Sequence, residues 1–338
     1  MRLLVRPRAP LLMLLLLAPA IPELLTGSTP ITGLAYDPVR FGVDFAFEIG
    51  LYGCGAVLVR EFAVVLRKGW ASILLLGAAY GIVEEGFAVH TIFQTSGAPV
   101  NALATYGHAF GVNWLWAVGI VAFHATYSIA LPILLVRLWY PDVARARWFD
   151  ASALTAVAAV FLGTVAVFST HEGYPPRPGA LAGFLLLVGG LVALAWRAPA
   201  ALLSVKPGVG RAGPLGLVLV GTLGFLGWLM TLALAAGRWV SAWVAAALLV
   251  LVNLGAVVYV TARVGEVDLE RSEFWFATGM LLALWVWDIP IEFGVPGILA
   301  VTVVFVYLQY RLGERIRARS ATVRSNIPPV ATGAPPLG

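Results

Sequence analysis

The chain has 338 residues, of which 60% are hydrophobic and 12% are charged, and its mean hydropathy is +0.91. Soluble domains carry about a quarter charged residues, so this composition excludes a soluble multidomain protein. The formal net charge of +5 does not indicate nucleic-acid binding, because the basic residues fall in short loops and tails rather than in one patch. The one cysteine, Cys54, excludes an intramolecular disulfide and a cysteine-built metal site.

Apolar segments of about 20 residues recur along the chain, which is the length that crosses about 30 Å of hydrocarbon. Each must be helical, because a helix pairs its own backbone groups where water is absent. The predicted fold class is an all-α, polytopic transmembrane bundle of about ten helices. The predicted spans are 9–26, 42–66, 71–93, 112–138, 151–169, 180–196, 214–236, 239–262, 274–291 and 295–312.

Arginine and lysine set the predicted orientation, since cytoplasmic loops of membrane proteins carry an excess of both. With the N-terminus in the cytoplasm, the outer loops hold three of the 22 basic residues, namely Arg40, Arg177 and Arg238. Both termini are therefore predicted to be cytoplasmic, and the protein is predicted to lie in the plasma membrane of a bacterium. The first span has features of a signal peptide, but Pro19 and Pro22 disfavour cleavage, and we expect it to be retained.

A single transmembrane domain is predicted over 1–312, followed by a cytoplasmic tail over 313–338. The tail is basic at its start and ends in "RSNIPPVATGAPPLG", whose proline, glycine and alanine content predicts disorder. The expected partners are the lipid bilayer and, near the start of the tail, anionic lipids. The residues predicted to contact these lipids are Arg311, Arg315, Arg317 and Arg319.

The segment "LLLGAAYGIVEEGFAVHTIFQ" carries Glu84, Glu85 and His90 inside a predicted span. A charge at the bilayer centre costs about 2.5–3.5 kcal/mol on insertion scales, so such residues indicate a polar site. His124, in the next span, lies at nearly the depth of the glutamates, and Ser128 lies one turn further along the same face. Adjacent helical residues point about 100° apart, which predicts that only one glutamate faces the centre of this site.

Four other acidic residues lie in the outer parts of predicted spans. Asp44 and Glu48 share a helix face because four residues separate them, and Asp288 and Glu292 flank the turn between the last two spans. Spans 5 to 8 carry no charged residue in their cores. We therefore predict a polar cavity that opens outward between spans 2, 3, 4, 9 and 10, with spans 5 to 8 packed outside it.

The segments "GCGAVLVREFAVVLRKGWASILLLGAAYGIVEEGF" and "HATYSIALPI" resemble a family of uncharacterised bacterial multi-pass membrane proteins, and this resemblance implies no activity. The adjacent Glu84 and Glu85 also resemble the glutamate pair of CAAX-protease-like intramembrane peptidases. This sequence departs from that pattern, since Val89 stands where the family has arginine, Ile120 where it has phenylalanine, and Ser128 where it has asparagine or aspartate. A single histidine also stands where that family has two.

Three functions fit these residues. The first is binding or transport of a small solute or protons, with Glu84, Glu85 and His124 as titrating groups. The second is an intramembrane hydrolase, in which a glutamate acts as general base and His124 stabilises charge or holds a metal. The third is a structural or assembly partner whose buried polar groups hold helices together. The first fits best, an enzyme is the less favoured alternative, and no resident cofactor or metal ion is expected.

Overall fold

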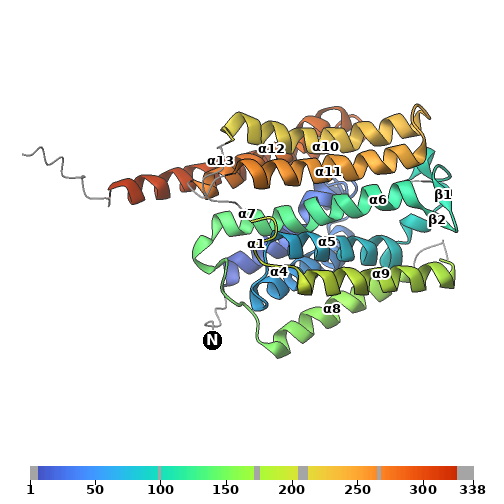
Figure 1. Ribbon diagram of the computed structural model, residues 1–338, viewed down its shortest axis with the longest axis horizontal. Helices are drawn as coiled ribbons and strands as arrows, with labels where there is room; N and C mark the ends of the chain where they lie inside the picture. Colours follow the sequence, from blue (N-terminus) through green and yellow to red (C-terminus); the bar gives the residue numbers. More distant parts are fainter. Residues whose placement is uncertain (1–6, 98–99, 171–175, 205–211, 265–267, 326–338) are drawn as a thin grey trace, which may run out of the picture.

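The structure is a computed structural model that describes residues 7–97, 100–170, 176–204, 212–264 and 268–325. It is 79% helical, and the long helices run roughly parallel to one another (Figure 1). Eight helices are long and apolar enough to cross a membrane. The chain is therefore an all-α, multi-pass membrane protein, which confirms the predicted fold class at this level.

Three of the eight helices consist of several segments, and five are single. The composite helices are Pro38–Val65, which contains α3 (Pro38–Glu48) and α4 (Cys54–Val65); Trp70–Ala88, which begins with α5 (Trp70–Val83); and Trp114–Trp139, which contains α6 (Trp114–Phe123) and α7 (Leu131–Trp139). The single helices are α8 (Ala151–Ser169), α9 (Pro178–Arg197), α10 (Pro214–Ala236), α11 (Ala242–Arg263) and α12 (Leu269–Ile291).

The first and last predicted spans are not among these eight. The first corresponds to α1 (Arg8–Pro19) and η1 (Ala20–Leu24), which have 12 and 5 residues. The last corresponds to α13 (Ile298–Ser325), which combines an apolar first half with a strongly charged second half. The count of about ten spans and the cytoplasmic position of both termini stay predictions.

Helix α13 includes the basic start of the predicted tail. The helix continues through 313–325, and its first turns beyond residue 312 still contact the rest of the bundle. Leu312 and Ile316 are buried, and Arg319 donates hydrogen bonds to Glu270 and to the Leu138 carbonyl. Residues 326–338, the remainder of the predicted tail, lie outside the described residues.

Helix starts follow local sequence signals. Asp150 caps α8 by accepting a hydrogen bond of 2.8 Å from the Ala153 N–H, and Ser241 caps α11 in the same way. Pro178 and Pro214 are the first residues of α9 and α10, where a missing N–H costs nothing. Capping and proline together fix where four of the outer helices begin.

The connection between α5 and α6 holds the short elements of the fold. It contains the 3-10 turns η4 (Thr91–Phe93) and η5 (Asn101–Leu103) and a two-stranded antiparallel sheet. The strands β1 (His108–Ala109) and β2 (Val112–Asn113) pair with His108 opposite Asn113. Elsewhere, the short helix α2 (Gly33–Tyr36) precedes α3, and the 3-10 turn η7 (Pro141–Val143) follows α7.

Four π-helical segments interrupt the helices of the first four predicted spans. They are η1 (Ala20–Leu24), η2 (Ile49–Gly53), η3 (Glu84–Ala88) and η6 (His124–Ala130). π-helical turns are rare and occur frequently at functional sites. Pro132, just after η6, cannot donate a hydrogen bond to the Ser128 carbonyl, so the regular helical pattern is already broken there. The first four predicted spans are thus the part of the bundle with irregular backbone.

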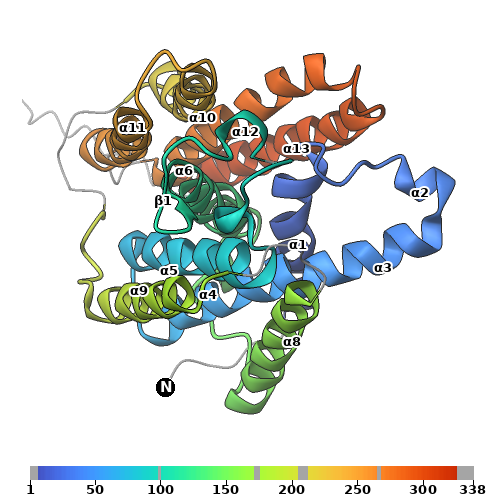
Figure 2. The same cartoon turned by 90° about the vertical axis from the view of Figure 1, so that its right-hand side faces the viewer.

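The helices form an inner and an outer set (Figure 2). Buried residues make up 56%, 67% and 72% of the apolar windows of the three composite helices, but only 11–28% of those of α8 to α11. Helix α1 contacts η2 and α7 and belongs to the inner set. On the outside, α8 contacts α4, α9 contacts α5, α10 contacts α12, and α11 contacts α6. The helices predicted as spans 5 to 8 therefore lie on the periphery.

Two glycines allow α10 and α12 to touch through their backbones. A Cβ atom added at Gly279 would lie 2.2 Å from the Val218 carbonyl oxygen, and one at Gly221 would lie 2.6 Å from the Phe276 carbonyl oxygen. Small residues are typical of such contacts between membrane helices, because association there depends on close packing. Gly224, also on α10, has open space at its Cβ position.

Replacing Gly221 by alanine should destabilise the protein by about 1–3 kcal/mol, because the new methyl group would overlap the backbone of α12. The same substitution at Gly224 should be neutral or slightly stabilising, since alanine is the better helix former. Thermal unfolding of the two purified variants in detergent compares them directly. Equal melting temperatures would contradict the close contact between α10 and α12.

Candidate functional site

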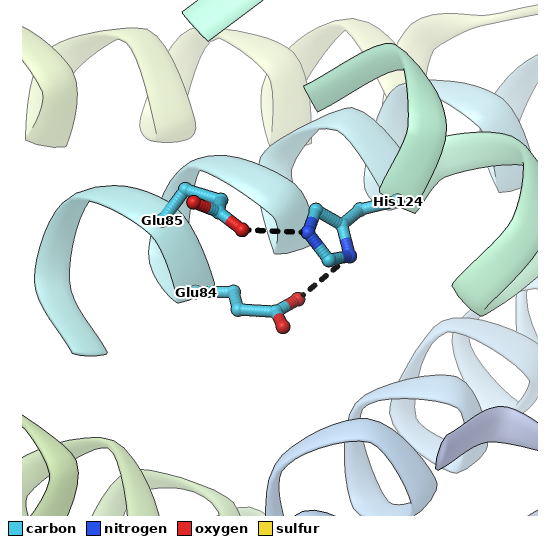
Figure 3. A group of neighbouring side chains, drawn as sticks. All are labelled: Glu84, Glu85 and His124. Atoms are coloured by element: carbon cyan, nitrogen blue, oxygen red, sulfur yellow. Dashed lines mark hydrogen bonds and ion pairs between the residues drawn. The ribbon is translucent and has the colours of Figure 1, made fainter. Parts of the chain in front are cut away.

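Glu84, Glu85 and His124 meet at the beginning of two π-helical segments (Figure 3). Glu84 Oε2 lies 3.0 Å from His124 Nδ1, and Glu85 Oε1 lies 2.8 Å from His124 Nε2. The exposed fractions of the three residues are 1%, 5% and 3%. These three residues, called the triad below, form a carboxylate–imidazole–carboxylate arrangement inside the bundle.

Glycines of α5 make this meeting possible. A Cβ added at Gly77 would lie 2.9 Å from the Ala125 Cα, and one at Gly81 would lie 3.0 Å from the His124 Cβ. The absence of side chains at these positions lets α5 approach α6 and η6 closely. The short carboxylate side chains that follow α5 can therefore reach the imidazole of the neighbouring span.

Both glutamates contact the same ring, so the prediction that only one of them faces the centre of the site is wrong. The two side chains diverge, as adjacent helical residues do. The imidazole fits into the angle between them and presents a different nitrogen to each carboxylate (Figure 3).

Glu85 is held by a directed chain of donors. The Trp116 indole N–H donates to Thr91 Oγ1 at 2.9 Å, and the Thr91 hydroxyl donates to Glu85 Oε2. Because Thr91 already accepts from the indole, its own proton is directed at the carboxylate. With His124 Nε2 on its other oxygen, Glu85 has the donor set of an ionised carboxylate.

Glu84 has fewer partners than Glu85. Its Oε2 atom is at ion-pair distance from His124 Nδ1 but has no hydrogen-bond partner within the described residues. Ser128 Oγ lies 2.9 Å from the same nitrogen and offers it an alternative partner. The Tyr80 hydroxyl is buried beside the Glu84 carboxyl group. The Glu84 side of the ring is thus the side on which a proton can change its position.

A second group of acids lies next to the triad. The Tyr52 hydroxyl donates to Glu23 Oε1, while Thr29 Oγ1 lies 3.1 Å from Glu23 Oε2 and 2.6 Å from Glu48 Oε1. A threonine hydroxyl has one proton and can donate to only one of these carboxyl groups. For both contacts to be hydrogen bonds, one of the two glutamates must itself carry a proton. Glu23, Thr29, Glu48 and Tyr52 are called the outer cluster below.

Aromatic rings connect the outer cluster with the triad. The centroid of the Tyr52 ring lies 6.0 Å from that of His124, and the Tyr80 ring lies 6.2 Å from it. Tyr52 therefore contacts Glu23 through its hydroxyl and His124 through its ring. Glu23 and Thr29 are partly exposed, whereas the triad is buried. The polar groups therefore extend from the partly exposed Glu23 and Thr29 to the buried triad.

Two of the predicted site residues lie apart from the triad. Asp44 is exposed and pairs with Arg40 at 3.6 Å, because α3 projects from the bundle and only its last residues reach it (Figure 2). His90 follows the end of η3 in a left-handed conformation, with φ of 57°, and its ring packs edge-on against Phe93. Of the acids at the start of the second span, Glu48 alone is buried in the outer cluster.

Asp288 and Glu292 have separate partners at the turn between α12 and α13. Asp288 is buried and accepts a hydrogen bond from Thr302. Glu292 accepts hydrogen bonds from the Gly297 and Leu299 N–H groups at 2.8 and 2.9 Å, and these donors hold the pKa of its carboxyl group below the usual range. Glu292 thus caps the start of α13. In the described part of the chain, no hydrogen bond or ion pair joins Asp288 or Glu292 to the triad or to the outer cluster.

Sequence reasoning missed Glu23, Tyr52, Tyr80 and Thr91. Glu23 stands alone in the apolar first span, in "APAIPELL", and this isolation is the signal that could have identified it. Tyr52 lies one turn after Glu48, so a polar face continuing from that residue was also visible. Nothing in the sequence marks Tyr80 or Thr91 beyond their closeness to the paired glutamates.

The triad and the outer cluster are held together by direct contacts, and an outward-opening cavity beside them stays a prediction. The structure contains cavities of about 440 and 160 Å³, and both are lined by residues other than the triad. One ligand atom from each triad residue lies within 4.8 Å of the others, so a metal ion is a chemical possibility at this position. The second chemical possibility at this position is that the triad holds a proton within its hydrogen bonds.

No protein family model matches the chain, and no curated protein and no solved structure matches it. The geometry of the triad and of the outer cluster is therefore the basis on which a function is proposed.

Replacing Thr91 by valine should destabilise the protein by about 1–3 kcal/mol, because the Trp116 N–H and Glu85 Oε2 would lose a shared partner in a buried site. Thr126 provides a matched control, since its hydroxyl donates only to carbonyls of its own helix. Thermal unfolding of the Thr91→Val and Thr126→Val variants measures the difference. A Thr91→Val protein as stable as the control would show that the chain of donors to Glu85 is unimportant.

Proposed function

We propose that the protein, in the plasma membrane of a bacterium, binds and transfers protons at the triad and couples this transfer to movement of a small solute. The observation that carries the proposal is the position of the His124 imidazole between two buried carboxylates. Chains of acidic residues and histidine inside membrane helices are typical of proton relays in pumps and transporters.

The unequal surroundings of the two glutamates assign them different roles. Glu85, which accepts from Thr91 and contacts Nε2, stays ionised and fixes the ring. Glu84 exchanges one proton with Nδ1. In one state Glu84 is a neutral acid that donates to the neutral ring, and in the other the ring is an imidazolium between two carboxylates. The net charge of the triad is −1 in both states, so this internal step requires no charge to enter or leave the buried site.

The outer cluster is the proposed route by which protons reach the triad. Glu48 and Glu23 share a proton through the Thr29 hydroxyl, and Tyr52 holds Glu23 near the His124 ring. The proposed last step carries this proton from Glu23 to Glu84 through a bridging water molecule, which gives up one proton to Glu84 as it takes one from Glu23. Hydrogen bonds in such chains polarise one another, which favours movement of a proton along them. The partly exposed Glu23 and Thr29 form the entrance of this route.

A metal-dependent hydrolase is the second candidate, and the short distances between the triad ligand atoms favour it. A single ion is normally held by donors that converge on one point at about 2.0–2.2 Å. Here the carboxylates lie on opposite nitrogens of the ring, so an ion at Nε2 would engage Glu85 and leave Glu84 on the other edge. This arrangement fits proton exchange better than a three-ligand metal centre.

Anionic lipids remain proposed partners of the charged half of α13. Arg317 is strongly exposed and pairs with Glu314 on the same helix, and Arg311 is exposed as well. Arg315 is exposed too, with its guanidinium group over the Trp139 ring, whereas the half-buried Arg319 lies beside Glu270. The three exposed arginines are therefore the ones that fit lipid headgroups.

Replacing Glu84 by glutamine should reduce proton flux into proteoliposomes by about a hundredfold, because a positioned proton-transfer group contributes at least that factor. The flux is followed with a pH-sensitive dye inside the vesicles under an imposed membrane potential. Asp288→Asn is the matched control, since it removes another buried carboxyl group outside the triad, and its flux should equal that of the wild type. A folded Glu84→Gln protein with wild-type flux would refute the proposal.

A further inference from the structure

The larger of the two cavities described above lies at the other end of α5 from the triad. Its volume is about 440 Å³, within the range of small-molecule sites. Trp70 and Ile73, in the first turn of α5, belong to its wall, whereas the triad follows the last turn of that helix. The two sites are therefore separated by about 20 Å of helix.

Cationic side chains gather in the wall of this cavity. The charged lining residues are Arg60, Arg67, Lys68, Arg137, Arg145 and Glu273. Glu61, which pairs with Arg60, and Glu270, which interacts with Glu273 and pairs with Arg319, are further carboxylates close to them. Five cations line the cavity with one carboxylate, and positive charge stays in excess when these two neighbours are counted. An excess of basic residues at one end of a membrane bundle serves orientation, but orientation alone does not require them to line one cavity.

Two of the cations have fixed structural roles. Arg60 is buried, stacks on the Trp148 ring with its guanidinium carbon 3.6 Å from the ring centroid, and donates to the Ala144 and Ala146 carbonyls. Arg137 forms an ion pair with Glu273 and lies 5.0 Å from the Trp70 ring centroid. These contacts hold the wall of the cavity in place.

Donors nevertheless remain for a ligand. Arg137 Nε is buried and has no hydrogen-bond partner within the described residues. The Lys68 ammonium donates one hydrogen bond, of 3.1 Å, to the Ala198 carbonyl, although an ammonium has three protons. Arg67, next to it in the turn between α4 and α5, is exposed and has a left-handed backbone with φ of 53°. Strained backbone of this kind at a non-glycine residue is concentrated at ligand sites.

We propose that this cavity binds a phosphate group, carried by a soluble phosphate compound or by an anionic lipid headgroup, through Arg67, Lys68 and Arg137. A phosphate group carries up to about two negative charges and three strong acceptor oxygens, which match a guanidinium fork and an ammonium placed side by side. The cavity is larger than phosphate alone. Its apolar wall, with Leu14, Ile133 and Val136, accommodates the less polar remainder of such a molecule.

The test compares the double variant Arg67→Gln/Lys68→Gln with Arg197→Gln, which removes an exposed arginine from the end of α9 outside the cavity. In the first arm, binding of inorganic phosphate to protein in phosphatidylcholine nanodiscs is measured by calorimetry. In the second arm, retention of phosphatidylglycerol by detergent-purified protein is measured by native mass spectrometry. The double variant should lose about a hundredfold in affinity, and Arg197→Gln should lose none.

Loss of phosphate binding in the double variant alone supports the proposal with a soluble ligand. Retention of phosphatidylglycerol by the wild type and Arg197→Gln, with loss in the double variant, supports it with a lipid headgroup. Failure of the wild type to bind either probe, or equal binding by the double variant and Arg197→Gln, would overturn it. Both altered residues lie in a surface turn, and a melting temperature measured without ligand shows that the double variant is folded. Glu84→Gln should bind both probes like the wild type, so this site and the triad fail or succeed independently.

Discussion

An ionisable side chain inside a membrane bundle is tolerated only where the protein supplies what water supplied, either donors or an opposite charge. The inner helices of this protein meet that requirement with one another's polar groups. The imidazole of one span neutralises part of the charge of two carboxylates on the neighbouring span, and a threonine backed by an indole completes the coordination of one of them. The arrangement of the first four predicted spans follows from the need to bring these groups together.

Backbone irregularity and small residues make the cluster possible. In regular α-helices the side chains follow one another at a fixed angular spacing. The π-helical segments that begin at Glu84 and at His124 change this spacing locally. Gly77 and Gly81 then reduce the separation of the two spans until the short carboxylate side chains reach the ring. The same helices carry the cationic cavity at their opposite ends, so each end of the inner set has its own chemistry.

Much of this organisation is predictable from the sequence because the membrane simplifies the physical problem. The length of the apolar segments predicts the membrane-spanning helices, and the absence of charged residues from the cores of spans 5 to 8 predicts that these spans lie on the outside. The closeness of Glu84, Glu85 and His124 follows from similar depths on consecutive spans. Depth does not reveal rotation or tilt, which is why Asp44 was grouped with Glu48 although α3 projects from the bundle. The π-helical segments have no sequence signature, so the placement of both glutamates on one ring could not be foreseen.

The length of α13 has a mechanical consequence. The 15 residues from Arg311 to Ser325 form about 22 Å of continuous helix, in which Leu312, Ile316 and Arg319 still contact the bundle. Figure 1 shows the end of this helix extending beyond the rest of the bundle. A fluorescent protein or affinity handle fused after this projecting end would have a rigid attachment that points away from the bundle.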